Sequence, residues 1–129
     1  MVKLSRIAPE LPVSDLKGAL KSYQQKLGFE VVAEMPGGDY AIVERDGIAI
    51  HLFHSASQLL SPVGLHIFTN QLEELHGELQ SRGAFLSQEI KRQPWGTRDF
   101  RVNDGWGNQL KFTEPLSNEW EPVPAEHHG

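Results

Sequence analysis

Apolar and polar residues follow two different periods in the first half of the chain. Residues 6–13 are expected to form a strand, and the segment after them carries apolar residues three and four positions apart, as an amphipathic helix does. Ser14 or Asp15 is the expected N-cap of that helix, and Gly28 is its expected C-terminal stop. Three extended runs follow, at residues 29–34, 40–45 and 48–54.

The second half repeats this order. Residues 64–69 are an expected strand, and Asn70 with Glu73 resembles a capping box ahead of a second helical stripe. The stripe ends at Gly83, and further strands are expected at residues 85–90, 97–103 and 109–113. Leu20 and Gly28 of the first half recur as Leu75 and Gly83 at the same spacing. We therefore expect a β-α-β-β-β unit that occurs twice.

A tight hairpin at Asp46-Gly47 divides the side chains of its strands between two faces. Its register places Tyr40 opposite Phe53, Ile42 opposite His51 and Glu44 opposite Ala49. The other face is apolar throughout, with Ala41, Val43, Ile48, Ile50 and Leu52. We expect this apolar face to cover the helix and two mixed faces of this kind to enclose a cleft. In the last strand, Lys111 points into the cleft by the same argument.

Length and charge narrow the class of protein. The 129 residues fit one domain with modules at about residues 4–54 and 63–114 and a tail at 115–129. The absence of cysteine excludes disulfides and thiolate metal sites. A formal net charge of −5 argues against nucleic acid as a partner, and no apolar run is long enough to span a membrane. We expect a cytoplasmic protein.

Several segments are similar to those of a known superfamily. They are Ala8-Pro9-Glu10-Leu11-Pro12-Val13-Ser14-Asp15-Leu16, Tyr23 with Leu27-Gly28-Phe29, Gln93-Pro94-Trp95-Gly96, Arg98-Asp99-Phe100 and the turn from Asp104 to Asn108. The chain resembles the vicinal oxygen chelate superfamily of glyoxalases, extradiol dioxygenases and antibiotic-resistance proteins, and within it the bleomycin resistance proteins most closely. Ser22 and the Gly105-Trp106 pair depart from the usual residues of the superfamily.

The resemblance implies an α+β fold in which two βαβββ modules, with curved mixed sheets, form a cup. It also implies a homodimer that exchanges the N-terminal strand between protomers. Pro9 stands where the resistance proteins have a proline that keeps the exchanged strand extended. Pro9 and Pro12 lack a backbone donor, so they suit either an exchanged segment or a protected edge strand.

Enzymes of this superfamily hold a metal between the first and last strands of each module. The matching positions here are Ala8, His51, Gly64 and Lys111. Only His51 is a metal ligand at neutral pH, and a lysine ammonium repels a cation. We therefore expect no metal, no cofactor and no catalytic residue. Glu10 and His66 lie two positions beyond Ala8 and Gly64, so a shifted triad of Glu10, His51 and His66 is an alternative.

Aromatic residues carry the expected ligand contacts. Tyr40 and Trp95 match positions where bleomycin-binding members hold the planar bithiazole tail of the drug, and His66 and Phe68 match aromatic positions beside the groove. Stacking and cation-π contacts of this kind each contribute about 0.5–2 kcal/mol. The competing interpretation is that these aromatic rings only pack at the rim of the cleft and bind no ligand. The full predicted ligand-binding set is Tyr40, Glu44, His51, Phe53, His66, Phe68, Trp95, Asp99, Arg101 and Lys111, with Glu44, Asp99, Arg101 and Lys111 forming a charge network.

These residues and the resemblance together imply a metal-free protein that binds bleomycin-type antibiotics, or a similar planar cationic compound, in stoichiometric amounts as a homodimer. Two alternatives stay open: a metal-dependent lyase, isomerase or dioxygenase of the same superfamily, and a binder of another aromatic small ligand. Trp106 is expected to be an exposed or interfacial plug without a ligand role.

Overall fold

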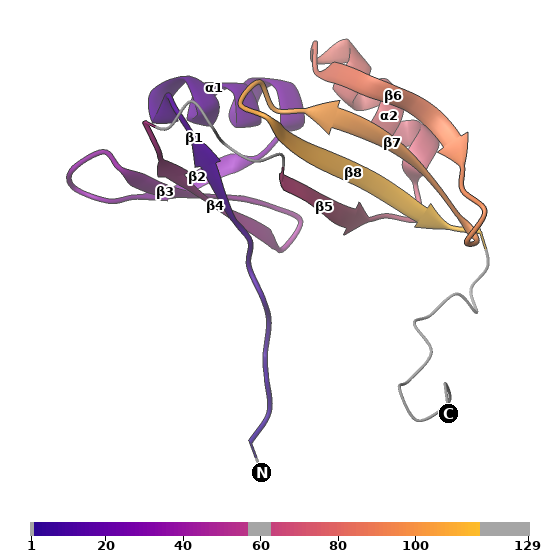
Figure 1. Ribbon diagram of the computed structural model, residues 1–129, viewed down its shortest axis with the longest axis horizontal. Coiled ribbons are helices and arrows are strands. Elements are labelled where there is room, and N and C mark those ends of the chain that lie inside the picture. Colours follow the sequence, from indigo (N-terminus) through magenta and orange to yellow (C-terminus); the bar gives the residue numbers. More distant parts are fainter. Residues whose placement is uncertain (1, 57–62, 117–129) are drawn as a thin grey trace.

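A computed structural model describes residues 2–56 and 63–116 of the chain. Two βαβββ modules lie side by side (Figure 1). The first contains β1 (Glu10–Val13), α1 (Leu16–Leu27), β2 (Glu30–Glu34), β3 (Tyr40–Arg45) and β4 (Ile48–His54). The second contains β5 (Val63–Phe68), α2 (Leu72–Ser81), β6 (Phe85–Arg92), β7 (Thr97–Asn103) and β8 (Asn108–Pro115). The expected tail lies outside the described residues from position 117 onward.

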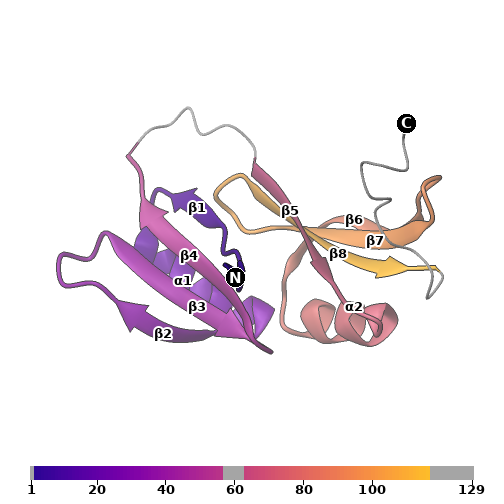
Figure 2. The ribbon, with the colours of Figure 1, turned by 90° about the horizontal axis from the view of Figure 1, so that it is seen from below.

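Each module has a four-stranded mixed sheet with the same topology. The first sheet has the order β1-β4-β3-β2 and the second has the order β5-β8-β7-β6. In both, the first strand pairs in parallel with the last, and the other pairs are antiparallel. Figure 2 shows α1 behind β3 and β4, so one face of the first sheet is covered and the other is not. The α+β fold with two βαβββ modules is confirmed.

The hairpin register is also confirmed, since Tyr40 pairs with Phe53 and Ile42 with His51. Ala41, Val43, Ile50 and Leu52 on the helix-facing side have no exposed surface. Ile48 was expected to join them, but its side chain is 42% exposed. The reason is its place at the end of the hairpin, beyond the reach of α1, where it borders a cavity described below.

The two helices begin differently. Asp15 caps α1, accepting a hydrogen bond from the backbone N–H of Gly18 at 3.0 Å, and Gly28 ends the helix with a positive φ of 75°. The expected capping box at Asn70 and Glu73 is wrong. The N-cap of α2 is Gln71, one residue later, and its side chain makes no capping hydrogen bond.

Glu114 takes part of the capping role at α2. Its Oε2 atom accepts a hydrogen bond from the backbone N–H of Leu72 at 3.3 Å. A carboxylate from β8 therefore satisfies a helix donor that the local sequence leaves unpaired. No helix among the described residues is long and apolar enough to cross a membrane.

Packing of both helices leaves one uncovered face on each sheet. We call the uncovered side of the first sheet, with Glu10, Tyr40, Ile42, Glu44, His51 and Phe53, the first open face. The uncovered side of the second sheet, with His66, Asp99, Arg101, Lys111 and Thr113, is the second open face. No hydrogen bond or ion pair between side chains joins the two open faces within the described chain.

The N-terminal segment was expected to be a strand from residue 6, but β1 begins only at Glu10. Residues 2–9 run away from the first sheet as an extended arm (Figure 1). Val2, Leu4 and Ile7 are each at least 95% exposed. The Pro9 carbonyl accepts a hydrogen bond from the backbone N–H of His51 at 3.0 Å, but no strand of the described residues pairs with residues 2–8, and Pro9 has no N–H to donate.

Among the described residues, the modules contact each other at two junctions between a helix and a hairpin turn. At the first junction, α1 meets the β7–β8 turn, where the Tyr23 hydroxyl donates to Asp104 at 2.8 Å. At the second junction, α2 meets the β3–β4 turn, where Arg45 donates to Glu78 through Nη1 at 2.9 Å and Nη2 at 2.7 Å. These junctions fix the two sheets relative to each other.

Candidate ligand-binding faces

Three side chains of the first open face form a continuous hydrogen-bonded set. The Tyr40 hydroxyl donates to Glu10 Oε2 at 2.8 Å and lies 2.5 Å from His51 Nδ1. Parallel pairing of β1 with β4 sets Glu10 beside His51, and the hairpin register brings Tyr40 across from Phe53, one step along the same face. The hydrogen bond to the Glu10 carboxylate raises the pKa of the Tyr40 phenol, and desolvation adds to the increase.

Proton counting fixes the tautomer of His51. The Tyr40 hydroxyl has one proton, and it goes to the Glu10 carboxylate. The contact between Tyr40 and His51 therefore requires a proton on His51 Nδ1, which donates to the phenol oxygen. In the neutral ring, the Nε2 atom is then a hydrogen-bond acceptor.

His66 on the second open face is held in the same way. Its Nδ1 atom lies 2.8 Å from Thr113 Oγ1, and the Thr113 hydroxyl donates to the Lys111 carbonyl at 3.0 Å. The only threonine proton is thus used, so His66 Nδ1 is the donor to Thr113. Burial lowers the pKa of His66, and the nearby charges of Lys111 and Arg101 lower it further against the opposing effect of Asp99.

Asp99 is fully buried at the second open face. Its Oδ1 atom accepts hydrogen bonds from Gln88 Nε2 at 2.6 Å and from Gln93 Nε2 at 3.2 Å. Its Oδ2 atom lies 3.7 Å from Arg101 Nη2 and has no hydrogen-bond donor among the described residues. Gln88 and Gln93 were absent from the predicted site, although the Gln93-Pro94-Trp95-Gly96 motif contains one of them.

The two open faces carry opposite charge. The register places Glu10, Glu30 and Glu44 on the first, with no lysine or arginine among the paired residues of that face. It places Lys91, Arg101 and Lys111 on the second, against the single carboxylate of Asp99. One face is therefore acidic and the other basic.

The predicted charge network forms only in part. Asp99 and Arg101 are paired, but Glu44 lies on the other sheet, and no ion pair among the described residues joins it to Lys111. The two residues lie on β3 and β8, which belong to different sheets. Glu44 instead borders a polar cavity of about 320 Å³ with Arg45 and Glu78.

The predicted aromatic residues are spread over both modules. Trp95, in the turn between β6 and β7, is 55% exposed, and Phe68 at the end of β5 is 53% exposed. The rings of His66 and Phe68 stack with centroids 6.1 Å apart. Phe68 also borders a cavity between the modules, whereas Tyr40 and Phe53 lie half-buried on the first open face.

The residues at the metal positions of the superfamily do not fit a metal centre. A Cβ atom built at Gly64 would lie 3.2 Å from Lys111 Cε, so the lysine side chain occupies the space of a ligand from that position. The shifted triad is also not assembled. Glu10 and His51 share the first open face while His66 lies on the second, and the described residues contain no group of three potential metal ligands.

Comparisons with known proteins agree with this fold. The family model of the Glyoxalase/Bleomycin resistance protein/Dioxygenase superfamily matches residues 3–112. A bleomycin resistance protein of Geobacillus stearothermophilus is 24% identical over 129 residues, covering 85% of this chain and 96% of the relative. A bleomycin resistance protein of Staphylococcus aureus matches with the same values.

Solved structures show the same architecture. The bleomycin-binding protein of bleomycin-producing Streptomyces verticillus, complexed with copper(II)-bleomycin, has a TM-score of 0.78 at 26% identity over 88% of this chain and 98% of that chain. The lactoylglutathione lyase of Agrobacterium tumefaciens has a TM-score of 0.71 at 16% identity over 91% of this chain and 98% of that chain. Binding proteins and an enzyme thus share this fold, so the fold alone does not select the function.

The paired βαβββ modules, each with one uncovered sheet face, define the class of fold. The match over most of its length shows that this chain belongs to the Glyoxalase/Bleomycin resistance protein/Dioxygenase superfamily.

Proposed function

We propose that the protein is a homodimer that binds a bleomycin-type antibiotic in clefts between open faces of two copies and carries out no chemical step. The observation that carries the proposal is the pair of uncovered sheet faces of opposite charge, which belong to two separate sheets and are joined by no side-chain hydrogen bond or ion pair among the described residues. Full-length similarity to bleomycin resistance proteins and to a bleomycin complex supports the choice of ligand.

The dimer follows from complementarity. The first open face of one copy is acidic and the second open face of another copy is basic. In a two-fold dimer, the acidic face of each copy therefore meets the basic face of the other. The arm of residues 2–9 exposes Val2, Leu4 and Ile7, and burial of such side chains against a partner is worth about 1.5–3 kcal/mol each. Pro9 at the base of the arm keeps it extended for exchange.

The ligand argument rests on the character of the two faces. Trp95 and Phe68 offer exposed rings for stacking against a planar group. The carboxylates of Glu10 and Glu44 favour a cation, and the Nε2 atom of His51 accepts a donor. A flat conjugated ligand with positive charge and several N–H groups matches this combination.

Titration with bleomycin, followed by tryptophan fluorescence, tests the ligand. We expect a Kd below about 1 µM, which corresponds to about −8.2 kcal/mol. Trp95→Ala should weaken binding at least tenfold, while Trp95→Phe, which keeps a ring, should stay within threefold of the natural protein. Absence of binding at 100 µM drug, roughly −5.5 kcal/mol, would contradict the proposal.

Light scattering after size exclusion tests the dimer. Leu4→Asp with Ile7→Asp places charges on side chains that are at least 95% exposed, so a shift from dimer to monomer would locate these residues in an interface. Met35→Asp, at another exposed apolar position, is the matched control and should remain dimeric. A natural protein that stays monomeric at high micromolar concentration would contradict the dimer.

Elemental analysis of untagged protein distinguishes the enzyme alternative. One nickel, zinc, iron or manganese ion per chain would favour a metal-dependent member of the superfamily. The proposal predicts much less than one metal ion per chain, because Lys111 stands at one of the metal-ligand positions of the superfamily and its side chain fills the space beside Gly64.

A further inference from the structure

The two junctions between the modules are related by the internal repeat. Tyr23 and Glu78 occupy equivalent positions of α1 and α2, as the spacing of Leu20 with Leu75 shows. Their partners are Asp104, the first residue of the β7–β8 turn, and Arg45, the last residue before the β3–β4 turn. The same contact is therefore made twice, with donor and acceptor exchanged between helix and turn.

The turns differ in length, and this changes what fills each junction. β3 and β4 are joined by Asp46-Gly47 alone, whereas β7 and β8 are joined by residues 104–107. The longer turn carries Trp106, whose indole packs against the hydrophobic core beside α1 and lies 3.4 Å from a Cβ atom built at Gly18. The shorter turn has no residue at the equivalent place.

A cavity of about 640 Å³ lies at the second junction, where the counterpart of Trp106 is missing. Its volume is in the range of sites that hold small organic molecules, roughly 300–1,000 Å³. Apolar side chains from both modules line it: Leu27, Phe29, Ile48, Ile67, Leu75 and Phe112. Ile48, 42% exposed, is apolar surface that an occupant would cover.

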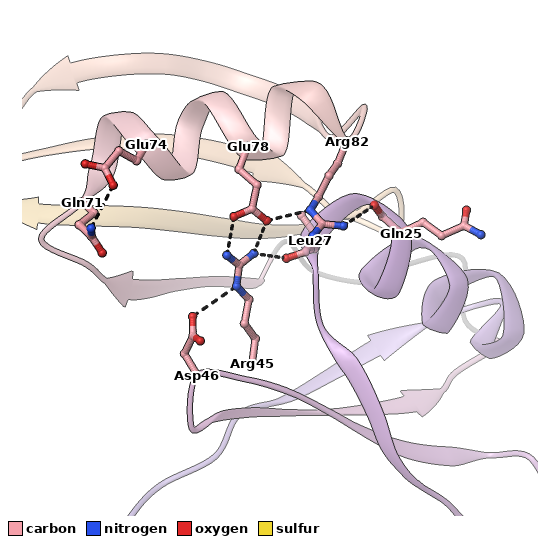
Figure 3. Close-up of polar contacts among 8 residues, drawn as sticks. All are labelled: Gln25, Leu27, Arg45, Asp46, Gln71, Glu74, Glu78 and Arg82. Atoms are coloured by element: carbon pink, nitrogen blue, oxygen red, sulfur yellow. Dashed lines mark hydrogen bonds and ion pairs between the residues drawn. The ribbon is translucent and has the colours of Figure 1, made fainter.

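The rim of the cavity is acidic. Arg45 is the single basic residue among the described lining residues, and it is already held by Glu78, by Asp46 at 3.4 Å and by the Leu27 carbonyl at 2.8 Å (Figure 3). Asp46 and Glu74 also border the cavity, and Figure 3 shows Glu74 on the first turn of α2 beside Gln71. Carboxylates outnumber the cation, so the rim favours a positively charged ligand.

We propose that this junction cavity binds a small planar bicyclic aromatic amine. Its ring takes the place that Trp106 holds at the first junction, and its ammonium group faces the carboxylates of Asp46 and Glu74. The cavity lies between α2 and the β3–β4 turn, on the helix-covered side of the sheets, and Phe68 is the one residue of the proposed bleomycin site that also borders it. The amine proposal does not depend on bleomycin binding.

Tryptamine, indole and indole-3-acetate are the probes, measured by titration calorimetry and by backbone amide shifts. We expect tryptamine to bind at least fivefold more tightly than indole-3-acetate, with shifts at Ile48 and Leu75 and none at Tyr40. No tryptamine binding at 5 mM, equal binding of the two charged probes, or shifts confined to the open faces would overturn the proposal. If a second copy of the chain covers the cavity, tryptamine will not bind at 5 mM.

An insertion tests the symmetry argument directly. Adding Trp-Gly after Gly47 copies the turn of the second module and should weaken tryptamine binding at least tenfold, because the new indole fills the cavity. Adding Ser-Gly at the same place gives the same turn length without a ring, and binding should stay within threefold. Unchanged binding in the Trp-Gly protein, or loss in both, would overturn the proposal.

A charge variant covers the case in which an insertion prevents folding. Asp46→Asn with Glu74→Gln changes two exposed groups and preserves the residue shapes, and asparagine tolerates the positive φ of 52° at position 46. Tryptamine binding should fall at least threefold while indole binding is unchanged. An equal loss for both probes would show that the carboxylates do not recognise the amine.

Discussion

Tyr23 on α1 donates a hydrogen bond to Asp104, 81 positions away in the chain, and both side chains are buried between the modules. Burial and the neighbouring carboxylate raise the pKa of the Tyr23 phenol well above its usual value, so it remains a donor over the whole physiological range. The same carboxylate also accepts from the backbone N–H groups of Trp106 and Asn108 and from the Asn108 side chain. One acidic residue thus organises both the long turn and its contact with the other module.

Tyr23→Phe is expected to lower the free energy of unfolding by about 1.5–3 kcal/mol, the usual effect of losing a buried hydrogen bond to a charged group. Urea denaturation measures the change. Tyr40→Phe, at a tyrosine whose partner Glu10 is exposed, is the matched control and should lose clearly less stability than Tyr23→Phe. Equal losses in the two variants would contradict a special role for the first junction.

Arg45 and Glu78 should contribute less, because their side chains are 23% and 36% exposed and solvent screens the pair. A double-mutant cycle with Arg45→Met and Glu78→Gln is expected to give a coupling energy of about 0.5–1 kcal/mol that decreases at 1 M salt. The pair of Arg98 with Glu73, whose carboxylate is 71% exposed, is the control and should couple more weakly. A coupling independent of salt would contradict this account.

Local features of the fold could be predicted from the sequence. The Asp46-Gly47 turn set the register of β3 and β4, and Asp15 and Gly28 marked the ends of α1, because these signals act within a few residues. The order of the elements could also be predicted, because local signals of the same kind occur in both halves of the chain. The expected strand from residue 6 was wrong at its beginning, because a strand needs a neighbour to pair with and the described residues provide none for residues 6–8.

Contacts between modules could not be predicted in the same way. Nothing near Tyr23 indicates Asp104 as its partner, and the partner depends on how two modules pack. The hydrogen bonds of Gln88 and Gln93 to Asp99 depend on irregular pairing of β6 with β7, which shifts register there. The difference in turn length was visible in the sequence, but its consequence for a cavity was not.

His51 is expected to be protonated at Nδ1 in its neutral form, since Tyr40 gives its proton to Glu10. Nitrogen NMR of the imidazole at pH 8 should show a protonated Nδ1 and an unprotonated Nε2. Tyr40→Phe removes the acceptor, so the ring should shift towards the Nε2-protonated form. Glu10→Gln, which keeps a carbonyl acceptor for Tyr40, should preserve the natural tautomer. An Nε2-protonated ring in the natural protein would contradict the proton count.

His66 makes the folded state sensitive to acid. Burial, Lys111 and Arg101 hold its pKa below the ordinary value of 6.5, so the unfolded chain binds a proton more readily than the folded one. Stability is therefore complete above pH 6.5 and decreases as the pH falls from 6.5 through the lower pKa of the folded protein. His66→Gln removes this titration, and the decrease in unfolding free energy between pH 7.5 and pH 5 should be smaller in the variant than in the natural protein.

His54→Gln, whose side chain is exposed, is the control and should leave the decrease unchanged. Identical pH profiles for the natural protein and His66→Gln would contradict a pKa of His66 lowered by burial and by the neighbouring cations.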